Sequence, residues 1–232
     1  METTSSKEGN KSKTYFAFFD LDHTITSAVS GRELAFGAYK RGLMKRSDLL
    51  GAIFLSIIYK IRLVDPTKAI NKMGRWVKGI TIEDLEKLCA GVSEEVLIPS
   101  IYEKVREEIQ THKDNKAGLV ILSSTLAPVG SRMSEDLGMD DILCSELEAV
   151  NGILTGRPVG TFCFGEEKAV KLKQYCEKNN SKLQDAWYYG DAFADLPALS
   201  IVGHPVCINP ERKLERIAKK NGWKIYYWDK IP

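Results

Sequence analysis

Two aspartates separated by one residue stand near the start of the chain, in the segment Asp20-Leu21-Asp22-His23-Thr24. The preceding residues, 14–19, are largely apolar and aromatic, which is typical of a buried strand that ends at Asp20. If the strand conformation continues, Asp20 and Asp22 point to the same side, because side chains alternate along a strand. Two close carboxylates repel each other, and a hard cation such as Mg²⁺ relieves that repulsion. One carboxylate can then act as a nucleophile while the other transfers protons, although a simple polar turn would also explain the pattern.

Hydroxyl groups and a lysine follow later in the chain. Ser123 and Ser124 end an apolar run, where hydroxyl and backbone N–H groups suit a phosphate oxygen or, alternatively, cap a helix. Lys168 lies near an expected helix start, where a positive charge opposes the helix dipole. This placement favours a functional counter-charge over an ordinary surface lysine only in combination with the other motifs.

A second acidic pair follows the next apolar run, in the segment Gly190-Asp191-Ala192-Phe193-Ala194-Asp195. Asp191 directly follows the expected strand, so it can complete a cation site with Asp20. Asp195 comes four residues later and can hold Lys168 or Asp191 in position. Taken alone, the same pair would read as a helix cap with an acid in the first turn.

The elements that must position these residues alternate between strands and helices. Strands are expected at 14–19, 118–122, 186–189 and 205–208, with a late edge strand at 223–228, and helices at 101–113, 167–179 and 213–220. This alternation predicts an α/β fold with a parallel sheet covered on both faces.

A block of helices interrupts this alternation. Residues 33–40, 47–61, 66–77 and 82–90 show helical patterns with no convincing strand among them. We therefore predict a flexible tail over 1–13, an α/β core over 14–30 and 104–232, and an inserted all-helical domain over 31–103.

The overall composition excludes several classes of protein. Thirty-three Lys and Arg residues against 31 Asp and Glu residues give a net charge of +2, which predicts no nucleic-acid partner. Five scattered cysteines without a CxxC pair indicate neither a disulfide framework nor a zinc site. The polar start of the chain is not a signal peptide, and the longest apolar run, 51–58, is too short for membrane insertion. A cytoplasmic location is expected, and no oligomeric state is predicted.

In combination, the motifs resemble those of the haloacid dehalogenase superfamily of phosphatases and phosphotransferases. The first motif matches Asp20–Thr24, the second Ser123, the third Lys168, and the fourth Gly190–Asp195. The helical insertion resembles the cap of subfamily IB, the phosphoserine-phosphatase-like group. The resemblance implies a three-layer, Rossmann-like core with a helical cap.

The resemblance also implies a role for each residue of the first motif. Asp20 would attack phosphorus and form an aspartyl-phosphate. Asp22 would protonate the leaving oxygen and then activate water, while Thr24 steadies this acid–base residue.

The remaining motifs would bind the phosphoryl group and the metal. Ser123, Ser124 and Lys168 would contact the transferring group. The side chains of Asp20 and Asp191, with the backbone carbonyl of Asp22, would hold Mg²⁺.

Departures from the family pattern leave the substrate open. The glutamate that recognises the substrate in phosphoserine phosphatases falls on Val29, and Ser124 and Thr125 stand where the second motif usually has two glycines. Ala194 replaces the usual asparagine of the fourth motif. Specificity is expected to depend on the inserted helices, with these candidate residues: Arg32, Glu33, Arg75 and Trp76.

The sequence thus predicts a Mg²⁺-dependent phosphatase acting on a small phosphomonoester. Phosphoserine, another amino-alcohol phosphate such as histidinol phosphate, and a lipid phosphate remain alternatives as substrate. Phosphotransfer to an alcohol other than water is a second possibility. A non-catalytic binding protein is the least favoured one, since both first-motif acids are intact.

Overall fold

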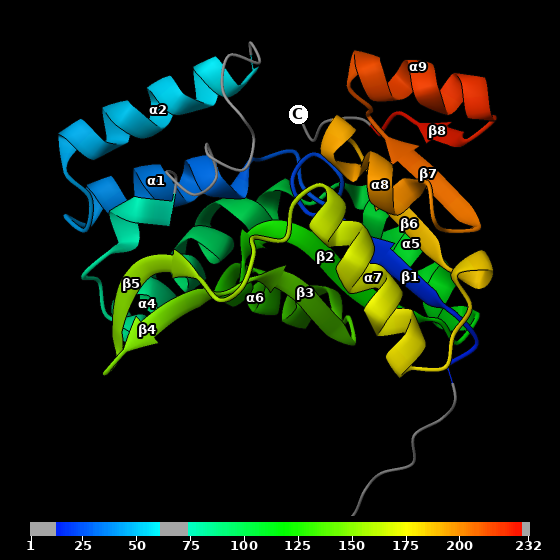
Figure 1. Ribbon diagram of the computed structural model, residues 1–232, viewed down its shortest axis with the longest axis horizontal. Coiled ribbons are helices and arrows are strands. Elements are labelled where there is room, and N and C mark those ends of the chain that lie inside the picture. The colour runs from blue at the N-terminus through cyan, green and yellow to red at the C-terminus, as the bar shows by residue number, and fades with distance from the viewer. Residues whose placement is uncertain (1–12, 61–73, 229–232) are drawn as a thin grey trace, which may run out of the picture.

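The computed structural model describes residues 13–60 and 74–228 of the chain (Figure 1). The predicted tail lies almost wholly outside the described residues, and so does the greater part of the helix predicted at 66–77. Side chains are described from residue 13 to residue 53 and from residue 76 to residue 228.

A six-stranded sheet forms the centre of the molecule, and all of its strand pairs are parallel. In spatial order the strands are β3 (Asp141–Ser145), β2 (Gly118–Leu126), β1 (Phe16–Phe19), β6 (Trp187–Gly190), β7 (His204–Ile208) and β8 (Lys224–Tyr226). Phe18 and Phe19 are fully buried on opposite faces of β1, as expected for a central parallel strand.

Helices cover both faces of this sheet. One face packs against α5 (Glu103–Asp114) and α6 (Ala127–Leu137), and the other packs against α7 (Glu166–Lys178), α8 (Leu196–Leu199) and α9 (Arg212–Asn221). Figure 1 shows α7 and α8 in front of the sheet, with α6 behind it. The predicted three-layer α/β fold is confirmed.

The described part of segment 31–103 is helical. It contains α1 (Ser30–Lys40), α2 (Arg46–Lys60), a short helix Gly74–Val77, α4 (Ile82–Val92) and two further turns, Ser93–Leu97 and Ile98–Ser100. In Figure 1, α1 and α2 lie to the left of the sheet, away from α9.

Among the described side chains, those of the inserted helices share one hydrophobic cluster with the sheet. Leu34 of α1 and Leu88 of α4 belong to the same buried cluster as Val129 and Met133 of α6. Helix α4 and the turn Ser93–Leu97 pack directly against α6, while α1 packs on α4 and α2 packs on α1.

Five labelled elements in the described part of the chain were not predicted from the sequence: β3, α6, α8, and the antiparallel hairpin β4 (Leu147–Val150) with β5 (Ile153–Pro158). Asn151 and Gly152 form the hairpin turn with φ of +51° and +78°, so this Asn-Gly pair was the signal that could have found it. The hairpin reaches the inserted helices, since the backbone N–H of Ile82 donates to the carbonyl of Gly152 at 2.9 Å.

All five cysteines are buried and carry free thiols. Among the helices of the described segments, none combines the length and apolar character that crossing a bilayer would require.

Candidate active site

The acidic residues gather where three neighbouring parallel strands end. Asp20 follows β1, Asp191 follows β6, and Ser123 lies in the second half of β2. The backbone N–H of Asp20 donates to the carbonyl of Tyr189 at 2.9 Å, which ties the end of β1 to β6. Because the carboxyl ends of these strands share one edge of the sheet, residues more than 160 positions apart in the sequence meet there.

Lys168 is the positive charge at the centre of this group. Its side chain is 4% exposed, and Nζ lies 2.7 Å from Oδ1 of Asp20 and 2.6 Å from Oδ1 of Asp195. Burial would lower the pKa of Lys168, but the carboxylates of Asp195 and Asp20 outweigh burial and keep the pKa well above its usual value. Lys168 is therefore a permanently charged partner for both acids.

Asp195 is completely buried, and both of its oxygens are hydrogen-bonded. Oδ1 accepts from Lys168 and, at 2.7 Å, from the Tyr188 hydroxyl. Oδ2 accepts from the backbone N–H groups of Asp191 at 3.2 Å and Ala192 at 3.0 Å. Asp195 thus holds both Lys168 and the loop that carries Asp191. The sequence had left open which of these two partners Asp195 would bind, and in the structure it binds both.

Gly190 is required by the close approach of Asp195. A Cβ atom at this position would lie 2.7 Å from Cγ and 2.8 Å from Oδ2 of Asp195. Any other residue would push the carboxylate away from the loop that it holds.

Asp22 is bound by Ser30 at the start of α1. Its Oδ1 accepts from the backbone N–H of Ser30 at 2.8 Å, and its Oδ2 accepts from the Ser30 hydroxyl at 3.1 Å. An anion is favourable at a helix N-terminus, and Val29 at the cap position offers no side-chain acceptor. Burial, and next the charge of Asp20, raise the pKa of Asp22 to about 7, while the bonds from Ser30 oppose the rise. Such a carboxyl group can exchange protons near neutral pH.

The hydroxyl residues differ in what they contact. Ser123 is 1% exposed and hydrogen-bonds Asp20. Ser124 has its carbonyl occupied by the Ser145 hydroxyl at 3.0 Å, and no contact of its side chain with the acids is seen. Thr24 is fully buried, but its hydroxyl has no hydrogen-bond partner among the described residues, so the predicted support of Asp22 has no visible bond.

The structure describes the side chains of three of the four predicted specificity residues. Arg32 and Glu33 form an ion pair with each other at 2.7 Å on the first turn of α1. Trp76 is half-buried and packs against the main hydrophobic cluster. The side chain of Arg75 lies outside the described part of the structure.

The donor set fits a divalent cation. Oxygen atoms of Asp20, Asp191 and Asp195 lie within 4.8 Å of one another. Because both oxygens of Asp195 are taken by donors, Asp20 and Asp191 are the better candidates for ligands. Burial, followed by the charges of Asp195 and Asp20, raises the pKa of Asp191 well above its usual value. A hard cation would relieve this electrostatic cost, and carboxylate oxygens are the ligands that Mg²⁺ prefers.

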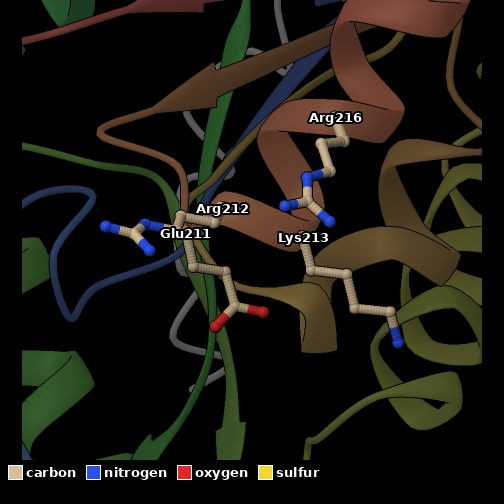
Figure 2. Close-up of a pocket in the computed structure, with 4 residues that line it drawn as sticks. All are labelled: Glu211, Arg212, Lys213 and Arg216. Atoms are coloured by element: carbon tan, nitrogen blue, oxygen red, sulfur yellow. The ribbon is translucent and has the colours of Figure 1, made fainter.

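A basic concavity of about 460 Å³ borders the loop after β6 (Figure 2). Its lining consists of Glu211, Arg212, Lys213 and Arg216. The backbone N–H of Glu211 donates to the carbonyl of Asp191 at 2.9 Å, which joins the start of α9 to this loop. The concavity places positive charge beside the acidic site.

Two residues that contact the acids, Ser30 and Tyr188, were not predicted from the sequence. Ser30 could have been recognised as a polar residue three positions before the helix predicted over 33–40 and close to the first acidic pair. Tyr188 gave no signal, because an aromatic residue inside a strand is indistinguishable from an ordinary core residue.

A parallel α/β sheet with two acidic pairs and a lysine at its carboxyl edge is the arrangement expected of the hydrolase family that the sequence motifs resemble. Residues 17–200 match the haloacid dehalogenase-like hydrolase family, and the chain belongs to it. The predicted family is confirmed.

Relatives with assigned names resemble most of the chain. The phosphoserine phosphatase SerB1 of Mycobacterium tuberculosis is 28% identical over 213 residues, which cover 90% of this chain and 69% of the relative. A histidinol-phosphatase of Neisseria meningitidis is 26% identical over 225 residues, or 90% of this chain and 96% of the relative. A crystal structure of a Bordetella pertussis protein of unknown function has the same fold, with a TM-score of 0.83, 23% identity, and coverage of 92% of this chain and 98% of that chain.

Proposed function

We propose that the protein is a Mg²⁺-dependent phosphomonoesterase that works through an aspartyl-phosphate on Asp20. The observation that carries the proposal is the contact of a buried, charged Lys168 with Asp20, held by Asp195. A nucleophilic carboxylate must approach an anionic phosphoryl group, and a fixed ammonium group reduces the repulsion between them.

The first step transfers the phosphoryl group to the protein. An Asp20 oxygen attacks phosphorus, and the bond from phosphorus to the substrate oxygen breaks. Asp22 gives its proton to the leaving oxygen, so the departing group is a neutral alcohol. The pKa of Asp22, raised to about 7 by burial and by Asp20, supports this role. Bound Mg²⁺ would be held by Asp20 and Asp191 and would offset the negative charge of the phosphoryl oxygens.

The second step releases phosphate. Asp22, now a carboxylate, takes a proton from water, and the water oxygen attacks phosphorus of the aspartyl-phosphate. The bond between phosphorus and the Asp20 oxygen breaks, so that Asp20 leaves as a carboxylate and inorganic phosphate is released. Splitting the displacement in this way replaces one difficult step by two easier ones. Ser123 and Lys168 are assigned to the phosphoryl oxygens, because both lie within hydrogen-bond reach of Asp20.

The inserted helices over 31–103 are proposed to act as a cap that carries substrate specificity. The substrate class proposed is a small phosphomonoester of an amino alcohol, in keeping with relatives named phosphoserine phosphatase and histidinol-phosphatase. Arg32 and Glu33, which form an ion pair, follow Ser30 by two and three residues, and Ser30 binds Asp22, so this pair is proposed to contact the leaving group.

Hydrolysis of a generic aryl phosphate by purified protein with Mg²⁺ tests the proposal. Asp20→Asn is expected to abolish turnover while the melting transition is retained. Asp185→Asn is the matched control, because Asp185 is an exposed acid just before the amino end of β6, at the opposite edge of the sheet. Full activity of Asp20→Asn would disprove the mechanism, and undiminished activity after exhaustive chelation would disprove the metal requirement. Relative rates on phosphoserine and histidinol phosphate then identify the substrate.

A further inference from the structure

Tyr188 is fully buried in β6, with its hydroxyl among the charged groups of the candidate site. The hydroxyl donates to Oδ1 of Asp195 at 2.7 Å and accepts from Nζ of Lys168 at 3.2 Å. A phenol has a single proton, and an ionised carboxylate can only accept, so the contact with Lys168 uses an oxygen lone pair of the phenol. Together with the 2.6 Å contact between Lys168 and Asp195, these bonds close a ring of three groups.

This ring accounts for every proton of the ammonium group. Lys168 has three N–H donors, and its three acceptors are Asp20, Asp195 and Tyr188. Without the phenol oxygen, one donor would lose its acceptor and Asp195 would lose one of its donors. The two remaining contacts would fix the direction of Nζ less firmly.

The ring of Tyr188 is itself held rigidly. It belongs to the buried cluster that contains Phe18 of β1, Leu172 of α7 and Ala198 of α8. Because the ring is packed on all sides, the phenol oxygen has a fixed position. A catalytic group such as the Lys168 ammonium group contributes fully to a reaction only when it is held within a fraction of an ångström of its working position.

We propose that Tyr188 is a positioning residue for phosphoryl transfer, which holds the Lys168 ammonium group against Oδ1 of Asp20. The inference rests on the proposed function. It predicts that loss of the hydroxyl slows the chemical step more than it weakens substrate binding, because the cap and Ser123 are left intact and the Lys168 ammonium group is held less firmly but is not removed.

The neighbouring tyrosine provides a matched control. Tyr189 is also fully buried, but its hydroxyl points to the opposite face of β6, where it contacts His112 at 2.7 Å and Glu108 at 2.5 Å. Tyr189→Phe therefore removes an equally buried phenol oxygen from the same strand without touching Lys168.

The test compares kcat and KM of wild type, Tyr188→Phe and Tyr189→Phe on an aryl phosphate with saturating Mg²⁺. Tyr188→Phe is expected to lower kcat about tenfold with KM changed by less than about twofold, whereas Tyr189→Phe keeps the wild-type kcat. A wild-type kcat in Tyr188→Phe, or an equal loss in both variants, would overturn the proposal.

A double variant separates positioning from a general loss of packing. Because Tyr188 and Asp195 hold the same ammonium group, Tyr188→Phe should lower kcat by less than about twofold in an Asp195→Asn background. If the loss of kcat in the double variant equals the product of the losses in Tyr188→Phe and Asp195→Asn, the inference is contradicted. Should Tyr188→Phe not fold, a fluorinated tyrosine at position 188 keeps the ring and weakens the phenol as an acceptor. It is expected to lower kcat at an unchanged melting temperature, and an unchanged kcat would overturn the proposal.

The same measurements distinguish the two levels of inference. A wild-type protein that does not hydrolyse the aryl phosphate, or an Asp20→Asn variant that does, contradicts the proposed function. An active wild type that loses nothing in Tyr188→Phe contradicts the role of Tyr188 alone.

Discussion

The ammonium group of Lys168 lies 2.7 Å from Oδ1 of Asp20, although 148 positions separate the two residues in the sequence. The contact joins the first turn of α7 to the end of the central strand. It also explains how several acids can be buried at one edge of the sheet, since a fixed cation offsets part of their mutual repulsion.

Replacing Lys168 by methionine is expected to destabilise the fold as well as abolish activity. Methionine fills a similar volume, but Asp20 and Asp195 then lose their buried counter-charge. Removing one partner of a buried ion pair costs about 3 kcal/mol or more of unfolding free energy. Urea denaturation at pH 7 with EDTA measures the loss.

The control for this substitution is Lys173→Met on the same helix. Lys173 is 62% exposed and lies 3.9 Å from Glu177, so its replacement should change the unfolding free energy by less than about 0.5 kcal/mol. Equal effects of the two substitutions would show that Lys168 is not a buried counter-charge.

Gly190→Ala is expected to disturb the site through Asp195. The added Cβ would lie 2.7 Å from Cγ of Asp195, so the carboxylate must move away from Lys168 and the loop after β6. Overpacking of this kind costs about 1–3 kcal/mol, and activity should fall with it. Gly51→Ala is the control, because a Cβ at this position in α2 meets no atom of the described residues within 4 Å and alanine favours a helix. Wild-type activity of Gly190→Ala would contradict the role assigned to Asp195.

The sequence predicted the site motifs and the central strands for a physical reason. Strands such as β1 are buried on both faces and read as continuous apolar runs, and a polar residue marks their end. The weaker elements lack this signal. β3 is an edge strand that begins with exposed Asp141, and α6 contains Pro128 and Gly130, which lower its helical propensity.

Contacts between side chains of distant elements could not be predicted in the same way. The bond of Ser30 to Asp22 depends on where α1 begins after the acidic pair, which the local pattern places only within a few residues. Likewise, the sequence offered Asp195 two partners, and only the fold shows that it holds both Lys168 and the Asp191 loop.

Asp22→Asn is expected to stabilise the metal-free protein in a pH-dependent manner. The pKa of Asp22, raised to about 7 by burial and then by Asp20, exceeds its unfolded value, so ionising Asp22 opposes folding. The loss of unfolding free energy caused by this ionisation is small near pH 4. It grows as the pH rises toward 7 and stays constant above pH 7. The variant should match wild type at pH 4 and be about 2–4 kcal/mol more stable at pH 8 in EDTA.

Ser30→Ala provides the opposite control for this measurement. Loss of the Ser30 hydroxyl removes a bond that lowers the pKa of Asp22, so the window of destabilisation should extend to higher pH. A stability difference between Asp22→Asn and wild type that does not vary with pH would contradict the raised pKa.

A second pH effect is expected on the other face of the sheet. His112 is 2% exposed, and the charged and titratable groups at its ring are Tyr15, Tyr189 and Glu108. Burial lowers the pKa of His112, and Glu108 opposes this only in part. The unfolded chain therefore binds a proton more readily, and the stabilising contribution of neutral His112 is lost as the pH falls below about 6.5.

His112→Phe should therefore weaken the loss of stability between pH 7 and pH 5. At pH 7 the variant is expected to be about 1–3 kcal/mol less stable than wild type, because the two tyrosine hydroxyls lose a partner. The difference should shrink toward pH 5 in urea denaturation experiments. A difference that grows on acidification would show that His112 binds its proton more tightly in the folded state.

The basic concavity in Figure 2 predicts an ionic-strength effect on substrate capture. Arg212, Lys213 and Arg216 line it, and Glu211 ties it to the Asp191 loop. Positive charge beside a site raises the local concentration of an anionic substrate, and salt screens this attraction.

Arg216→Glu is expected to lower kcat/KM for a dianionic phosphomonoester about threefold or more at low salt, with kcat unchanged and the effect fading toward 0.5 M salt. Lys220→Glu makes the same charge change at the exposed far end of α9 and should have a smaller effect. Equal losses in both variants would indicate a response to net charge and not to the concavity.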